Sequence, residues 1–184
     1  MNKLIITDAD SKKLISTICR DISTSGWRPD YVVGITRGGL LPAVMISHWF
    51  NIPCETLTVS LRDGKQCESN LWMSEDAFGY VRATAVPRPA GEPTSDAALR
   101  KNILIVDDIN DSGATLNWIR EDWPSSCLPD DPAWREIWGN NVRFAVMVNN
   151  EASDFKDVDY VGLTINKLEK PVWCVFPWEE WWGR

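Results

Sequence analysis

The chain has 184 residues, of which 44% are hydrophobic and 24% are charged, a composition typical of one soluble globular domain. Its formal net charge of −7 at pH 7 argues against a protein that binds nucleic acid through many phosphate contacts. No apolar run approaches the roughly 18–20 residues needed to span a bilayer. The N-terminus also lacks the apolar region of a signal peptide, so the expected location is the cytoplasm and no membrane partner is expected.

The cysteine pattern indicates reduced thiols. Five cysteines are scattered along the chain without a C-x-x-C pair, and His48 is the only histidine in the sequence. Dispersed cysteines in an odd number, with a single imidazole, argue against a structural zinc site or a disulfide framework. The acidic balance still allows a small phosphorylated ligand, because local N–H groups, an arginine or a metal can outweigh the overall charge.

The first third of the chain predicts a β-α-β unit. A first helix should begin at Asp8 or Asp10 and end near Gly26, since the apolar residues between them recur at helical spacing. The apolar run 31–35 predicts a strand, residues 40–50 a helix, and residues 54–60 a second strand. This order implies a right-handed crossover and a parallel sheet.

The second half continues the alternation of strand and helix. Residues 103–106 predict a buried strand, 114–121 a helix, 142–148 another strand, and 160–165 and 172–176 short extended segments. Two stretches lack a sustained pattern. Residues 61–101, with room for a short strand at 84–86, are interpreted as a flexible lid or insertion, and residues 123–141 as an irregular insertion with room for one helical turn.

The segment 103–116 contains the strongest functional signal. Four apolar residues, typical of a strand covered on both faces, lead into Asp107 and Asp108. Small and hydroxyl residues from Asp111 to Thr115 then stand where a helix should begin, and the free N–H groups there favour an anion. Adjacent carboxylates beside such a place are explained by a cation or by ligand hydroxyls. The alternative is two solvated acids at a strand end, with Asp111 or Ser112 capping the helix.

A glycine turn, Thr36-Arg37-Gly38-Gly39, directly follows the strand 31–35. Its glycines let the backbone approach a ligand, and its arginine can make a forked contact to phosphate. Taken alone, the turn is better explained as an ordinary turn with a surface arginine. Because open α/β sheets bind ligands at the carboxyl ends of their strands, where both segments lie, we interpret the two together as one site.

These segments resemble a known family. Residues 103–116 closely resemble the signature for 5-phosphoribosyl-1-pyrophosphate (PRPP) in the type I phosphoribosyltransferases. Residues 35–42 resemble their pyrophosphate loop, in the form seen in bacterial xanthine-guanine phosphoribosyltransferase, and residues 172–179 resemble the purine-binding end of the same subgroup. The resemblance runs in order from about residue 10 to residue 180 and weakens across 61–101 and 123–141.

The resemblance implies a role for each segment. The residues that it assigns to the 5′-phosphate are Asp111, Ser112, Gly113, Ala114 and Thr115. Those that it assigns to pyrophosphate are Thr36, Arg37, Gly38 and Gly39, in a loop that the family often enters through a non-proline cis peptide. Asp107 and Asp108 would hold the ribose hydroxyls directly or through Mg²⁺, and Trp173 would stack on the base unless it is a core residue beside a strand.

Asp111 indicates the class of base that the protein accepts. Family members that act on 6-oxopurines have an Asp at this point, near N7 of the base, whereas adenine- and uracil-specific relatives tend to have a small apolar residue. A carboxylate there can take a proton as the base becomes a nucleophile. The implied reaction is Mg²⁺-dependent transfer of the phosphoribosyl group from PRPP to guanine, xanthine or hypoxanthine, giving a nucleoside 5′-monophosphate and pyrophosphate in purine salvage.

Two positions depart from the family pattern. Relatives bind O6 of the purine with a Lys just after the strand that corresponds to 142–148, and here Asn149 and Asn150 stand in its place. The mobile loop normally begins Ser-Tyr, but here it begins Ser60-Leu61 and is longer. The preferred base is therefore open. The alternatives are a non-catalytic regulator that senses PRPP or nucleotide on the same fold, and transfer to a non-purine acceptor.

The resemblance also implies the architecture. It predicts an α/β type I phosphoribosyltransferase fold in a single domain, 1–184, with a central parallel sheet flanked by helices. A long mobile loop at 61–101 and a small C-terminal hood at 165–184 would complete it. A homodimer or homotetramer is the expected assembly, and no nucleic-acid partner is expected.

Overall fold

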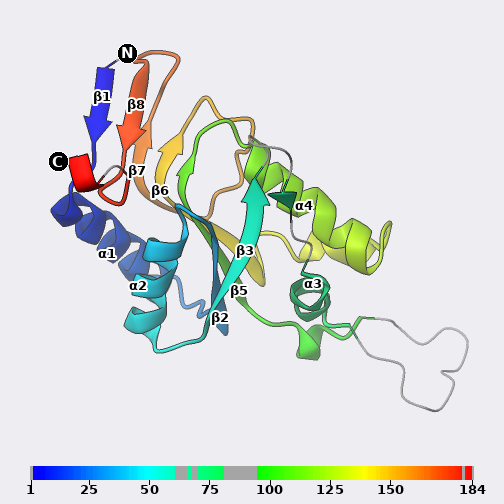
Figure 1. The fold of residues 1–184 in the computed structure, drawn as a ribbon. Coiled ribbons are helices and arrows are strands. Elements are labelled where there is room, and N and C mark those ends of the chain that lie inside the picture. Colours follow the sequence, from blue (N-terminus) through cyan, green and yellow to red (C-terminus); the bar gives the residue numbers. More distant parts are fainter. Residues whose placement is uncertain (1, 61–65, 68–69, 81–94, 180, 184) are drawn as a thin grey trace, which may run out of the picture.

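A six-stranded sheet forms the centre of the computed structural model, which describes residues 2–60, 66–67, 70–80, 95–179 and 181–183 (Figure 1). The sheet has the order β4-β3-β2-β5-β6-β7. Its parallel strands are β3 (Cys54–Ser60), β2 (Tyr31–Thr36), β5 (Ile103–Asn110), β6 (Val142–Asn150) and β7 (Tyr160–Ile165). The short edge strand β4 (Gln66–Cys67) pairs with β3 in the antiparallel direction. The predicted central parallel sheet is confirmed.

Helices cover both faces of this sheet. Helices α1 (Asp8–Thr24) and α2 (Leu40–Phe50) lie on one face, and α3 (Leu71–Phe78) and α4 (Ala114–Cys127) lie on the other (Figure 1). Side chains alternate along each strand, so Val32 and Leu104 pack with α1 and α2, whereas Val33 and Ile105 pack with α3 and α4. The uninterrupted apolar runs in the strands follow from this burial on two faces.

Helices α1 and α2 match their predicted bounds. Helix α1 begins at Asp8 through a capping box, in which the hydroxyl of Thr7 accepts the N–H of Asp10 and the carboxylate of Asp10 accepts the N–H of Thr7. Helix α2 covers the predicted range 40–50. None of the described helices combines the length and the apolar character needed to cross a lipid bilayer.

Part of the stretch 61–101, where the sequence shows no sustained pattern, has regular structure in the residues that the structure describes. Helix α3 lies within it, and Met73, Ala77 and Phe78 of this helix are buried against the sheet and α4. A 3-10 helix (Ala97–Leu99) precedes β5. Helix α3 has 8 residues, too few for a clear periodic signal, and packing rather than propensity stabilises it. The strand predicted at 84–86 and the predicted start of the lid at Leu61 lie outside the described residues.

The irregular insertion predicted at 123–141 is also more ordered than expected. Helix α4 continues beyond residue 121, through Pro124, to Cys127, and a 3-10 helix (Pro132–Glu136) follows. Trp123 and Trp134 are buried in the core, and Trp138 stacks on Phe144 with 5.8 Å between ring centroids. The burial of these large side chains outweighs the helix-breaking tendency of the proline.

A second, small sheet lies beside the main one. Strand β8 (Val172–Val175) of the predicted C-terminal hood pairs in parallel with β1 (Asn2–Ile5), a strand that the sequence did not predict. Both ends of the chain therefore lie near this small sheet (Figure 1). The pairing ties the N-terminus to the segment that carries Trp173, because Lys3 is the register partner of Trp173.

Candidate active site

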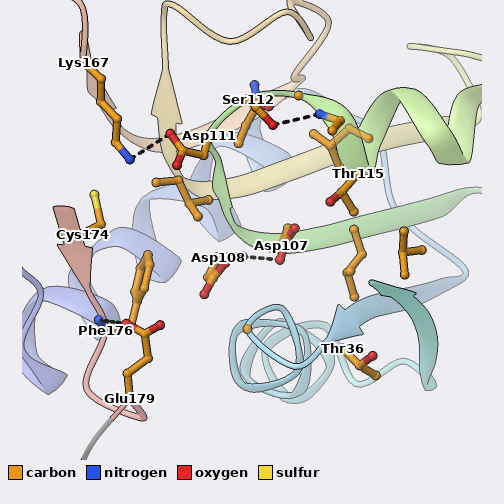
Figure 2. A pocket seen from close by; sticks show the side chains of 18 of the residues that line it. Thr36, Asp107, Asp108, Asp111, Ser112, Thr115, Lys167, Cys174, Phe176 and Glu179 are labelled. Carbon is orange, nitrogen blue, oxygen red and sulfur yellow. Dashed lines mark hydrogen bonds and ion pairs between the residues drawn. The ribbon is translucent and has the colours of Figure 1, made fainter. Parts of the chain in front are cut away.

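A cavity of about 410 Å³ opens where β2, β3 and β5 end, and residues after β7 and in β8 close one side of it (Figure 2). Its volume falls within the range of small-molecule sites. Both sequence segments that we interpreted as one site contribute to its wall. The position agrees with the rule that open parallel sheets bind ligands beyond the carboxyl ends of their strands.

The structure brings most of the predicted site residues to this cavity. Those that line it are Thr36, Gly38, Asp107, Asp108, Asp111, Ser112, Gly113, Ala114, Thr115 and Trp173. Arg37 and Gly39 are not among the lining residues: the side chain of Arg37 is exposed to solvent, and Gly39 is buried. An added Cβ at Gly39 would meet the carbonyl of Val106, so this glycine serves close packing between β2 and β5.

The glycine turn after β2 contacts the acid pair. The Thr36–Arg37 peptide is cis, as the family resemblance implied. A Cβ added to Gly38 would overlap the carboxylate of Asp108, so the main chain approaches this acid more closely than any other residue type would allow. The two segments are thus in contact as well as near one another.

Burial disfavours the charged form of Asp108. Asp107 accepts the main-chain N–H of Asp108 at 2.9 Å, and both side chains are partly buried. Burial raises the pKa of Asp108 to about 6, and the carboxylate of Glu179 acts in the same direction. Among the described residues that line the cavity, Lys167 is the one cationic side chain beside four carboxylates. A cation bound near Asp108 would relieve this repulsion.

The helix predicted after the acids begins at Ala114. Gly113 precedes it with φ +88°, and a Cβ there would meet the main chain of Phe155. Because Gly113 has no side chain to cap the helix, its first N–H groups are largely left for another partner, although the hydroxyl of Ser112 accepts the N–H of Ala114 at 3.4 Å. The start of α4 is therefore suited to an anion.

Asp111 does not cap this helix, because its carboxylate forms an ion pair with Lys167. The distance from Lys167 Nζ to Asp111 Oδ1 is 2.8 Å (Figure 2). Sequence reasoning missed Lys167. The signal that could have found it was its position, since it follows β7 at the same sheet edge that carries the other motifs.

The two asparagines that replace the family lysine do not line the cavity. They belong to β6, which extends to residue 150 instead of the predicted 148. The Asn149 side chain accepts a hydrogen bond from Asn110 at 2.8 Å. The Asn150 side chain is buried and donates to the carbonyl of Asp111 at 2.9 Å, while its oxygen accepts the main-chain N–H of Lys167 at 3.0 Å. The side chains of Asn149 and Asn150 therefore both form hydrogen bonds within the protein.

The C-terminal segment supplies an aromatic residue at the cavity. Trp173 is 45% exposed, so it is not the core tryptophan that the sequence left as an alternative. Glu179 and Phe176, which sequence reasoning did not single out, also line the cavity. The carboxylate of Glu179 accepts the main-chain N–H of Phe176 at 3.0 Å, and the side chain of Phe176 is buried.

Cys174 lines the same cavity and has a free thiol. Burial raises the pKa of this thiol, which keeps it protonated and unreactive near neutral pH.

Comparison with known proteins identifies the family. A model described as a phosphoribosyl transferase domain matches residues 5–180. The xanthine-guanine phosphoribosyltransferase of Cereibacter sphaeroides is 28% identical over 173 residues, which cover 88% of this chain and 82% of that protein.

Solved structures share the fold. The purine phosphoribosyltransferase of Pyrococcus horikoshii has a TM-score of 0.63 at 22% identity, covering 98% of this chain and 96% of its own. The xanthine-guanine-hypoxanthine phosphoribosyltransferase of Helicobacter pylori has a TM-score of 0.65 at 16% identity, covering 99% and 95%. With a family model across nearly its whole length, and with the fold of type I enzymes, the chain belongs to the phosphoribosyltransferase family.

Proposed function

We propose that this protein transfers the 5-phosphoribosyl group of PRPP to guanine, xanthine or hypoxanthine with the help of Mg²⁺. The main support for the proposal is that three features line one cavity. These are the acid pair Asp107 and Asp108, the start of α4 without a side-chain cap from Gly113, and Asp111 with Trp173. The relative named above for xanthine and guanine supports the same class of base.

The proposed PRPP site follows the wall of the cavity. The first N–H groups of α4 and the hydroxyls of Ser112 and Thr115 would bind the 5′-phosphate, since a helix N-terminus favours an anion. Thr36 and Gly38, which line the cavity from the end of β2, would bind pyrophosphate. Asp107 and Asp108 lie on the strand between these two places and would bind the ribose hydroxyls.

The donor set fits Mg²⁺. Within the part of the chain that the structure describes, no group of three or more His, Cys, Asp or Glu side chains could hold a metal ion. Mg²⁺ at phosphate-bearing substrates commonly has only one or two carboxylate ligands, with phosphate oxygens and water completing its octahedron. Asp107 and Asp108 would hold it, and because burial raises the pKa of Asp108, a bound cation would favour the charged form of this carboxylate. When bound, Mg²⁺ would neutralise charge on the departing pyrophosphate.

The residues of the chain would divide the chemical step. A ring nitrogen of the base forms a bond to C1 of the ribose while the bond from C1 to pyrophosphate breaks, and positive charge develops on the sugar. The carboxylates of Asp107 and Asp108 stabilise this charge. Asp111 takes the N7 proton that the base loses, and Trp173 holds the plane of the base.

The assay that tests the proposal combines the protein with PRPP, Mg²⁺ and each common base, and follows both nucleotide and pyrophosphate. We expect turnover with at least one 6-oxopurine, its loss in EDTA, and its recovery when Mg²⁺ is returned. Absence of turnover with every base, together with tight PRPP binding, would overturn the proposal in favour of a regulator that senses PRPP.

A further inference from the structure

We infer that Lys167 selects the base: its ammonium group binds the exocyclic oxygen of a 6-oxopurine and excludes the exocyclic amine of adenine. This inference rests on the proposed function, because it concerns the base that accepts the phosphoribosyl group. It assigns base recognition to Lys167, two residues after the end of β7, in place of Asn149 and Asn150 at the end of β6.

The position of Lys167 is the first support. It lines the same cavity as Asp111 and Trp173, and it reaches that cavity from a different strand than either of them. Its ammonium lies 2.8 Å from the carboxylate of Asp111, and the two side chains are 18% and 31% exposed. Figure 2 shows the two side chains pointing toward one another on the side of the cavity above Cys174. The remaining charged side chains of the described cavity wall are carboxylates, so Lys167 provides its cationic donor.

The main chain around Lys167 is held in place by hydrogen bonds. The Asn150 side chain accepts the N–H of Lys167 at 3.0 Å and donates to the carbonyl of Asp111 at 2.9 Å. Asn150 is 6% exposed, so one buried amide positions both members of the ion pair. The next turn is fixed as well, since the oxygen of Asn166 accepts the N–H groups of Leu168 and Glu169. A donor fixed in this way is suited to discrimination between bases.

The chemistry of the pair defines the edge of the base that it fits. An ammonium group only donates hydrogen bonds, and a carboxylate only accepts them. The pair therefore complements an acceptor beside a donor, which a 6-oxopurine presents as O6 beside N7–H. Adenine presents an amine at the same place. The amine of adenine and the ammonium group of Lys167 are both donors, so they cannot form a hydrogen bond with each other. The partly buried ammonium group would then lack the acceptor that O6 provides.

The experiment compares Lys167→Met, which removes the charge and keeps most of the length, with Lys170→Met as a matched control. Lys170 is exposed, lies in the same turn and does not line the cavity. Steady-state kinetics with guanine, xanthine, hypoxanthine and adenine would be measured at saturating PRPP. Thermal unfolding would report whether each variant is folded.

We expect Lys167→Met to lower kcat/KM for 6-oxopurines by about 10–100-fold, mainly through KM for the base, while KM for PRPP changes less than about threefold. Activity with adenine should stay equal or rise, so the ratio of kcat/KM for 6-oxopurines to kcat/KM for adenine should fall strongly. Lys167→Arg should restore part of the preference, because it returns a cationic donor. Lys170→Met should behave as the unmodified protein.

Two outcomes separate this inference from the proposed function. If the unmodified protein turns over 6-oxopurines and folded Lys167→Met keeps the same preference over adenine, Lys167 does not select the base. If the unmodified protein turns over no base, the proposed function fails, and calorimetric binding of GMP and AMP then decides the inference. If Lys167 recognises the base, Lys167→Met should weaken the binding of GMP more than the binding of AMP. Equal weakening of both affinities would overturn the inference.

Discussion

The carboxylate of Asp108 occupies the space that a side chain at position 38 would need, so Gly38 and Asp108 are joined by direct contact. Gly38 follows β2 and Asp108 lies near the end of β5, and these two strands are neighbours in the sheet. The contact explains why a glycine stands in the turn, and it makes the acid pair and the turn a single structural unit.

Replacing Gly38 should disturb that unit. We expect Gly38→Ala to lower the free energy of unfolding by about 1–3 kcal/mol, because a methyl group would displace the Asp108 carboxylate. Affinity for PRPP should fall as well. Urea unfolding of Gly38→Ala, Asp108→Ala and the double variant gives the coupling between the positions. The cost of the methyl group should shrink in the Asp108→Ala background, and strictly additive effects would contradict the contact.

The buried acid predicts a pH dependence of stability. Burial raises the pKa of Asp108 to about 6 in the folded protein, above the usual value near 3.8, so the unfolded chain loses this proton first as pH rises. The contribution of Asp108 to folding is therefore neutral below about pH 4, becomes unfavourable between about pH 4 and pH 6, and stays unfavourable above. Asp108→Asn should stabilise the metal-free protein by roughly 1–3 kcal/mol at pH 8 and change little at pH 4. Urea unfolding at the two pH values measures this, and an equal effect at both would disagree with it.

Asp111 should affect turnover more than binding of PRPP. We expect Asp111→Asn to lower kcat by about 10²–10⁴-fold, because the amide cannot take a proton from the base. KM for PRPP should change less than about threefold, since the N–H groups of α4 remain. Asp154→Asn, at an exposed acid outside the cavity wall, is the control. Unchanged kcat in Asp111→Asn would show that this carboxylate does not act as the base.

Asn150 should matter more for folding than its neighbour Asn149. Its buried amide joins the main chains of Asp111, Ala152 and Lys167, so Asn150→Ala leaves several polar groups without this partner. We expect a loss of about 2–4 kcal/mol in the free energy of unfolding and a higher KM for the base.

Asn149→Ala is the matched variant and should cost roughly 1 kcal/mol or less. The amide of Asn110, which donates to Asn149, also donates to the carbonyl of Phe155 and keeps that partner. Urea unfolding of both variants measures the difference. Similar losses for the two would contradict the bridging role of Asn150.

Trp173 should contribute to base binding and little to stability. Its side chain is 45% exposed and lines the cavity, so Trp173→Ala removes a stacking surface without opening the core. We expect KM for the base to rise by about 5–20-fold. Trp181→Ala, at a more exposed tryptophan outside the cavity wall, should leave kinetics unchanged. A large drop in Tm without a change in KM would instead identify Trp173 as a structural residue of β8.

The order of the main strands and helices, and the positions of the acid pair and the glycine turn, could be predicted from the sequence alone. These features are local. Apolar runs, helical spacing and glycine turns depend on residues close together in the chain, so 31–35, 40–50 and 103–116 could be interpreted without knowledge of the rest. The rule that ligands bind at the carboxyl ends of parallel strands then placed the acid pair and Gly38 on one cavity.

Other features depend on residues that are far apart in the chain, and local patterns do not indicate them. Helix α3 and the last turns of α4 are ordered because Phe78 and Trp123 find places in the core, which no local pattern indicates. Strand β1 exists through its pairing with β8 at the other end of the chain. Asn150 and Lys167 acquire their positions in the same way. What an amide or an ammonium group does depends on the groups within hydrogen-bond distance of it. For Asn150 and Lys167 these groups belong to distant parts of the chain, and they come together only when the sheet has formed.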